Sequence, residues 1–141
     1  MGETVITVVS GALVFILGQL FIEFIMKPIQ EFKDIRARVA WALVYYANIY
    51  GNPQDIKYKS EDHDIAREKL RMLAADLEAF VIRKPKVLKK IYDDKKILEA
   101  RSQLIGLSNG VYKATSHDRI YDFIDKRREK IISNLNLNCD V

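Results

Sequence analysis

The chain has few of the residue types that build catalytic and metal sites. It contains two histidines, His63 and His117, and a single cysteine, Cys139. A metal site needs several ligands that converge in a fixed geometry, whereas each histidine stands at a predicted helix start rich in Ser and acidic residues. Cys139 has no neighbouring His or basic cluster that would activate a nucleophile. We therefore expect no catalytic, metal or cofactor site and no enzymatic activity.

Glycine and proline are also scarce, with six and three residues. No glycine-rich phosphate loop or dinucleotide-binding pattern occurs. No stretch alternates apolar and polar residues with period two, and no hairpin signal separates two such runs. The apolar residues that make up much of the 49% hydrophobic content recur instead at three- and four-residue spacing. The sequence therefore predicts an all-α protein.

Basic residues are absent from the first 26 positions, which hold the longest apolar run of the chain. Val5 to Met26 contains one charged residue, Glu23. As a helix this run reaches about 33 Å, enough to cross the roughly 30 Å hydrocarbon core of a bilayer. A cleaved signal peptide is disfavoured, because no Lys or Arg precedes the run and no small-residue cleavage site follows it. We expect residues 1–27 to form a transmembrane anchor.

The orientation of this anchor follows from the basic residues that flank it. Lys27, Lys33, Arg36 and Arg38 come directly after the apolar run, and no Lys or Arg precedes it. Basic flanks remain on the cytoplasmic side of a membrane. The single Cys139 also suits a reducing compartment. The sequence thus predicts a single-pass membrane protein with its N-terminus outside and its C-terminal domain in the cytoplasm.

One face of the predicted membrane helix carries only small side chains. At about 100° per residue, Thr7, Gly11 and Gly18 lie close to one line along the helix. Small faces let two helix backbones approach closely in lipid. Glycine is also common in membrane helices for other reasons. We expect this face to support helix–helix packing between copies of the chain.

A second face of the same helix is polar. Gln19 and Glu23 lie four residues apart, about a quarter-turn from the small face. Ionisable groups inside a membrane usually point at a bundle interior or a watery cavity. Alternatively, Glu23 pairs with Lys27 near the interface, where both are hydrated. The polar face is therefore a candidate pore lining or a simple interfacial ion pair.

Residues 28–135 are expected to form a small antiparallel cytoplasmic bundle of about four main helices plus one short helix, followed by a flexible tail at 136–141. Pro28 either kinks a continuous helix or begins a new one. The apolar stripes predict a core that contains Leu43, Leu73, Leu77, Leu104 and Ile124. Expected helices run over 29–50, 60–83, from Asp93 or Asp94 to Gly110, and from Ser116 to 135, with the short one at 86–92.

The stretch from Val39 to Tyr50 is apolar nearly all round. Twelve or so residues are too few to span a bilayer, so we interpret it as a helix buried in the core.

A basic segment connects the second and third predicted helices. In a tethered domain it could be a solvated connection, a contact with the anionic inner leaflet at about 1 kcal/mol per residue, or a surface for an acidic protein or ligand. Nucleic acid is disfavoured, because only Tyr92 interleaves with the basic residues and no recognition motif is present. The segment consists of Arg83, Lys84, Lys86, Lys89, Lys90, Lys95 and Lys96.

Together these features predict a membrane-anchored cytoplasmic helical interaction or scaffold module that self-associates. Its expected partners are the lipid bilayer and further copies of the chain, with anionic headgroups or an acidic protein at the basic segment. The alternative is a homo-oligomeric pore or membrane-perturbing effector built from the N-terminal helix.

Overall fold

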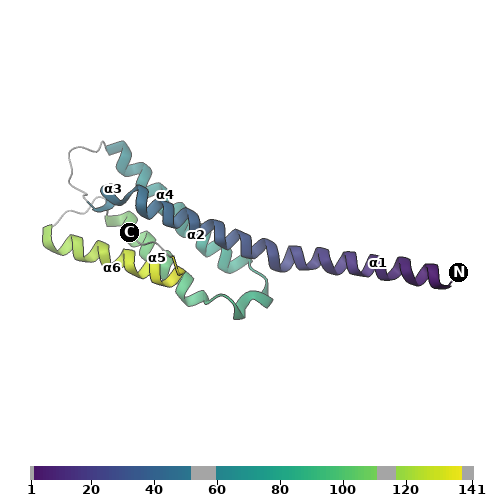
Figure 1. Cartoon of the computed structure of the whole chain (residues 1–141). Helices are drawn as coiled ribbons and strands as arrows, with labels where there is room; N and C mark the ends of the chain where they lie inside the picture. Colours follow the sequence, from purple (N-terminus) through teal and green to yellow (C-terminus); the bar gives the residue numbers. More distant parts are fainter. Residues whose placement is uncertain (1, 52–59, 111–116, 138–141) are drawn as a thin grey trace.

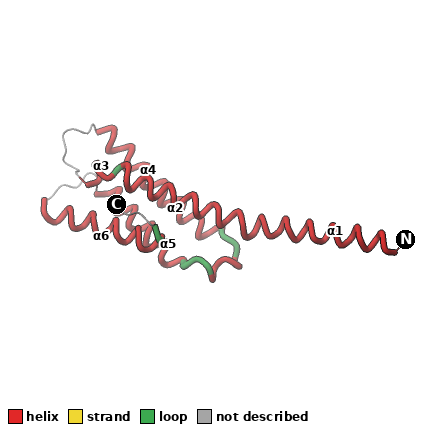
Figure 2. Tube along the Cα trace, viewed as in Figure 1, coloured by secondary structure: helices red, strands yellow, loops and turns green. Residues whose placement is uncertain are grey.

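The computed structural model describes residues 2–51, 60–110 and 117–137, and every regular element among them is helical (Figure 2). The prediction of an all-α fold is confirmed. In chain order the elements are α1 (Gly2–Phe21), η1 (Ile22–Met26), α2 (Lys27–Tyr45), α3 (Ala47–Gly51), α4 (Ser60–Arg83), η2 (Lys86–Lys90), α5 (Asp94–Gly110) and α6 (His117–Leu135).

Helices α1, η1 and α2 form a single long helix, and its α1 part projects from the bundle (Figure 1). The five residues of η1 are π-helical, and the Lys27 N–H donates to the carbonyl of Ile22, five residues earlier. Pro28 follows directly. In a regular α-helix its ring clashes with the carbonyl four residues earlier, and it has no N–H to donate. The wider turn is the local adjustment that lets the helix continue past Pro28.

Helices α2, α4, α5 and α6 pack as consecutive antiparallel neighbours. Arg38 Nη1 lies 2.9 Å from Asp76 Oδ2, whereas Arg83, later in α4, binds Glu31, earlier in α2. Opposed sequence order of this kind defines an antiparallel pair. The same relation joins α4 to α5, where Arg71 binds Asn109 and the later Glu78 binds the earlier Arg101. It also joins α5 to α6, where Glu99 pairs with Lys130 and the later Gln103 binds the earlier Arg127.

This up-and-down order decides what lies at each end of the bundle. Helix α2 runs away from α1, and α4 runs back toward it. The connection between α4 and α5, which contains η2, therefore lies at the end from which α1 departs (Figure 1). The connection from α3 to α4 begins at the opposite end.

The predicted core is confirmed. Leu43, Leu73, Leu77, Leu104 and Ile124 belong to one buried cluster, and the most exposed of them, Leu73, retains 7% of its surface. All four main helices contribute to this cluster. The three- and four-residue spacing in the sequence therefore identified the correct face of each helix.

Three aromatic rings close the core at the end of the bundle that carries α1. Phe32 of α2 stacks on Phe80 of α4, with ring centroids 4.8 Å apart. Tyr92, just before α5, meets both rings edge-on, at 4.7 Å from Phe32 and 5.3 Å from Phe80. Burial raises the pKa of the Tyr92 hydroxyl, and Arg36 opposes this effect. The rings thus hold the α4–α5 connection against α2.

The helix expected over 29–50 is interrupted at Tyr46, which has φ −94° and ψ 9° and separates α2 from α3. Carbonyls in the last turn of a helix lack intrahelical partners. The Tyr50 hydroxyl, carried by α3, donates a hydrogen bond to one of them, the carbonyl of Leu43. The interruption turns the chain so that Ile49 and Tyr50 enter the core.

The interpretation of Val39 to Tyr50 as a helix buried in the core holds for one face, which includes Val39 and Leu43, and is wrong for the other. Trp41, Val44 and Tyr45 are exposed by 55%, 51% and 63%. The opposite face packs against the bundle, but no described element covers these three side chains. The apolar residues of this stretch therefore line two different faces.

Most predicted boundaries hold. α4 ends at Arg83, two residues before Pro85, and α5 ends at Gly110. Asp93 is the N-cap of α5, since its Oδ1 accepts the backbone N–H of Lys95 at 3.0 Å. The packed chain extends beyond the predicted start of the tail, because Leu137 is buried and its N–H donates to the carbonyl of Ile132.

Candidate membrane helix and interaction surfaces

The most distinctive feature of the structure is the unburied apolar helix α1. Its large hydrophobic side chains are exposed by 46% (Leu20) to 71% (Phe15). Among the described residues, Thr4–Tyr45 is the one helix that is long and apolar enough to cross a membrane, and its most apolar part is not buried at all by the rest of the chain. A helix that is apolar all round requires an apolar environment.

The small face of α1 leaves room beside the backbone. A Cβ atom added at Gly11 or Gly18 would meet nothing within 4 Å. The packing of this single chain therefore gives no reason for glycine at either position, although glycine in a helix interior costs about 1 kcal/mol relative to alanine. Thr7 lies on the same helix, and its carbonyl accepts the hydroxyl of Ser10 at 2.9 Å.

The polar residues near the end of α1 are engaged locally. Lys27 Nζ lies 2.5 Å from Glu23 Oε1, and both side chains are exposed. This is the i,i+4 pair that the sequence offered as one interpretation of Glu23. Gln19 is exposed on α1. In the described part of the chain both Gln19 and Glu23 are exposed on the surface of the long helix.

The predicted basic surface divides into exposed residues and one buried residue. Including Lys84 was wrong: its side chain is 0% exposed, and its ammonium binds Asp94 and the carbonyl of Val81. Burial of a Lys is tolerated here because a carboxylate and a carbonyl satisfy it. The residues that are exposed are Arg83, Lys86, Lys89, Lys90, Lys95 and Lys96.

A groove between α2 and α4 was not predicted. Trp41 stacks on Tyr45, with centroids 4.5 Å apart and ring planes 15° from parallel. Beside them, Lys69 and Met72 of α4 line one side of a hollow of about 360 Å³. The sequence did contain a sign of this groove, because the stretch has apolar residues on both faces. The same pattern occurs in fully buried helices and in helices that bind a partner.

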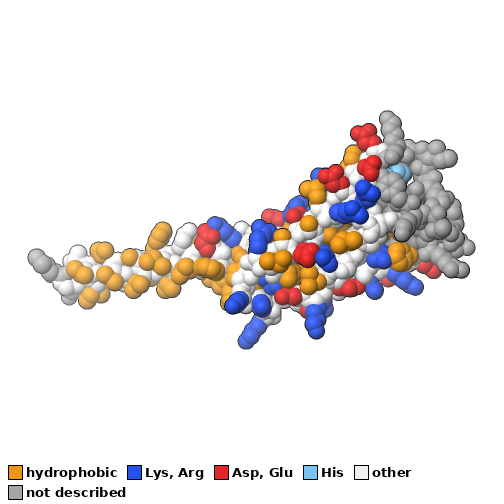
Figure 3. All heavy atoms as spheres, turned by 180° about the vertical axis from the view of Figure 1, so that it is seen from behind, with side chains coloured by type: hydrophobic (Ala, Val, Ile, Leu, Met, Phe, Trp, Pro, Cys, Tyr) orange, Lys and Arg blue, Asp and Glu red, His pale blue; other side chains and the backbone are white. Residues whose placement is uncertain are grey.

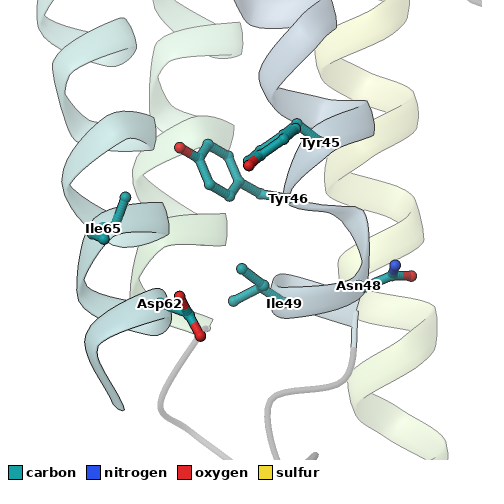
Figure 4. A pocket seen from close by; sticks show the side chains of 6 residues that line it. All are labelled: Tyr45, Tyr46, Asn48, Ile49, Asp62 and Ile65. Atoms are coloured by element: carbon teal, nitrogen blue, oxygen red, sulfur yellow. The ribbon is translucent and has the colours of Figure 1, made fainter. Parts of the chain in front are cut away.

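A second hollow, of about 300 Å³, lies at the far end of the bundle from α1. Figure 4 shows the ring of Tyr46, which lies between α2 and α3, directed toward the side of α4 that carries Ile65, with Asp62 of α4 close to Ile49 of α3. Burial, with a smaller contribution from Tyr45, raises the pKa of the Tyr46 hydroxyl. The side chains are mostly aromatic and aliphatic, so this hollow offers shape rather than reactive groups.

Within the described part of the chain, no three His, Cys, Asp or Glu side chains gather as metal ligands would. His63 is buried near the start of α4. The side chains of His117 and Cys139 lie outside the described residues.

Comparisons of the chain with protein-family models, curated proteins and solved structures found no match.

Proposed function

We propose that this chain is a single-pass membrane protein that self-associates and presents its helical bundle in the cytoplasm as an interaction or scaffold module. The observation that supports this most directly is α1, which is apolar all round and unburied in the single chain. It continues without a break into α2, a core helix of the bundle. In water this surface would drive aggregation, whereas in lipid it needs no further cover.

The proposed orientation rests on charge. Lys27 ends the apolar run, and Lys33, Arg36 and Arg38 follow on α2. Such residues near the end of a span favour the cytoplasmic side. The N-terminus is then outside.

Two surfaces support the association part of the proposal. The first is the face of Gly11 and Gly18, whose missing side chains have no role within one chain. The second is the α2–α4 groove with its exposed Trp41. Aromatic side chains at such sites contribute a large share of the binding energy in protein interfaces.

The pore alternative has less support. It requires Gln19 and Glu23 to face a central channel, and the ion pair between Glu23 and Lys27 accounts for the charge without one. We therefore keep the anchored module as the proposed function.

The first test concerns topology. A reporter that is active only in the cytoplasm is expected to be active when it is fused after Val141. The protein is also expected to stay in the membrane pellet after extraction with alkaline carbonate. Release by carbonate would show that α1 is not a span. An external reporter would reverse the proposed orientation.

The second test concerns self-association. Gly11→Leu with Gly18→Leu is expected to lower the mass measured by light scattering in mild detergent, because the new side chains block close backbone approach. The matched control, Ser10→Leu with Ala12→Leu, adds bulk to other faces of the same helix. If both variants keep the wild-type mass, the small face is not an interface.

A further inference from the structure

The α4–α5 connection, residues 84–93, is fixed beside the base of α1. The Phe32, Phe80 and Tyr92 cluster holds both of its ends against α2. Arg83, immediately before the connection, binds Glu31 of α2. Figure 1 shows the connection at the end of the bundle from which α1 departs. The residues between these anchors therefore extend from the bundle on the side of α1.

The depth of the connection can be compared with the thickness of a lipid headgroup layer. Phe32 comes six residues after Met26, which is about 9 Å along a helix. A bilayer of about 40–45 Å has a hydrocarbon core of about 30 Å, which leaves about 5–8 Å of headgroups on each side. With α1 along the bilayer normal, residues beyond the Phe32 level toward α1 lie at headgroup depth.

The carboxylates near the connection are already engaged. Glu31 binds Arg83, Asp94 binds Lys84, and Asp93 caps α5. By contrast, no carboxylate of the described residues lies within ion-pair distance of Lys86, Lys89 or Lys90, and all three are exposed. Space-filling Figure 3 shows Lys and Arg side chains projecting where the bundle meets α1. This end of the bundle thus has a local excess of positive charge.

Apolar side chains are interleaved with these lysines. Ile82 is exposed by 77%, Val87 by 59% and Ile91 by 63%. Lysines with exposed aliphatic side chains between them are the composition of segments that lie in a membrane interface. The α2–α4 groove is excluded from such a contact by its distance, since Trp41 is fifteen residues beyond Met26, about 22 Å along the helix.

We propose that the α4–α5 connection is a second membrane contact, in which Lys86, Lys89 and Lys90 bind the phosphates of an anionic leaflet while Val87 and Ile91 enter its headgroup region. This inference rests on the proposed function, because it requires α1 to span the bilayer. The contact restricts how far the bundle tilts and rotates about the base of α1. The groove on α2 and α4 is then held away from the membrane surface and open to the cytoplasm.

The test uses the full chain with Cys139→Ser, reconstituted in nanodiscs that contain brominated lipids and a quarter phosphatidylserine. A bimane dye is attached to Val87→Cys, to Leu13→Cys in the middle of α1, or to Met72→Cys in the groove. We expect strong quenching at residues 87 and 13 and none at residue 72. Loss of quenching at residue 13 would overturn the proposed function. Quenching at residue 13 without quenching at residue 87 would overturn the second contact alone.

The charge requirement is tested by Lys89→Gln with Lys90→Gln in the Val87→Cys chain. At the usual strength of such contacts, two lost charges lower the ratio of docked to undocked connection about thirtyfold. The matched control is Lys69→Gln with Lys126→Gln, two exposed lysines away from the connection. Quenching at residue 87 should fall in the first variant and in neutral nanodiscs, and persist in the control. Equal quenching in all four samples would overturn the role of the lysines.

Discussion

Removal of the Asp94 carboxylate is expected to destabilise the bundle strongly. The side chain of Lys84 is 0% exposed, and its ammonium has two partners. These are the carboxylate of Asp94 and the carbonyl of Val81, which lies 3.3 Å from Lys84 Nζ. In Asp94→Ala the ammonium stays buried with the carbonyl alone. Breaking a buried ion pair from one side typically costs about 3–5 kcal/mol. A domain of this kind has about 5–15 kcal/mol of total stability, so the loss is a large fraction of it.

The reverse substitution provides the control. Lys84→Met keeps an unbranched chain of similar volume and removes the buried charge. Asp94 is then left without its partner, but its side chain is 36% exposed and water can hydrate it. Replacing buried ionic groups by apolar ones is often neutral or stabilising. We therefore expect Lys84→Met to lower the free energy of unfolding by less than about 1.5 kcal/mol. The double variant Lys84→Met with Asp94→Ala should lower it by a similar amount.

Thermal unfolding of the full chain in mild detergent, followed by circular dichroism, measures this difference. The signal change reports the bundle if α1 stays helical in the micelle. Since 1 kcal/mol moves the Tm of a small domain by about 4–8 °C, Asp94→Ala should lower the Tm by more than about 10 °C. A Tm near wild type for Asp94→Ala, or a larger fall for Lys84→Met, would refute the assignment of Lys84 as a buried, pair-dependent charge.

Three further predictions concern the core and the end of α2. Leu77→Ala removes a fully buried side chain and should cost about 2–5 kcal/mol in denaturant unfolding, whereas Met72→Ala, at a half-exposed position, should cost far less; equal effects would place the core elsewhere. Tyr50→Phe leaves the Leu43 carbonyl without its donor and should cost about 0.5–1.5 kcal/mol. Burial raises the pKa of Tyr50, with Arg128 opposing and Asp125 reinforcing, so at pH 10 its hydroxyl should be less ionised than a free tyrosine, which is half ionised there. The absorbance titration of the wild type minus that of Tyr50→Phe isolates this group, and a midpoint at the ordinary pKa would contradict the burial.

Apolar spacing made the bundle predictable. Positions three and four apart must share a helix face, and one face of each helix had to be buried. That constraint gave the buried positions of Leu77 and Leu104 without knowledge of their neighbours. Local chemistry placed the ends as well, since Pro85 and Asp93 act on adjacent backbone.

The sequence could not predict features that depend on which residues meet in space. Lys84 is one of seven basic residues in its segment, and only its approach to Asp94 distinguishes it as buried. The exposed face of Trp41 was missed because the local composition does not tell a buried helix from one with a surface for a partner. At the interruption at Tyr46, the Tyr50 hydroxyl reaches back to the Leu43 carbonyl of α2, and the local sequence pattern does not indicate this contact.

The basic α4–α5 connection was predictable from the sequence in its position but not in its charge. In an up-and-down bundle every second connection returns to the end where the chain entered, so the α4–α5 connection had to lie beside α1 once four helices with short connections were predicted. What topology does not give is the charge that remains there. Arg83 is held by Glu31 and Lys84 by Asp94, whereas Lys86, Lys89 and Lys90 have no carboxylate within reach among the described residues. The case for a membrane contact therefore combines a placement that the helix order dictates with a free charge that only the side-chain contacts reveal.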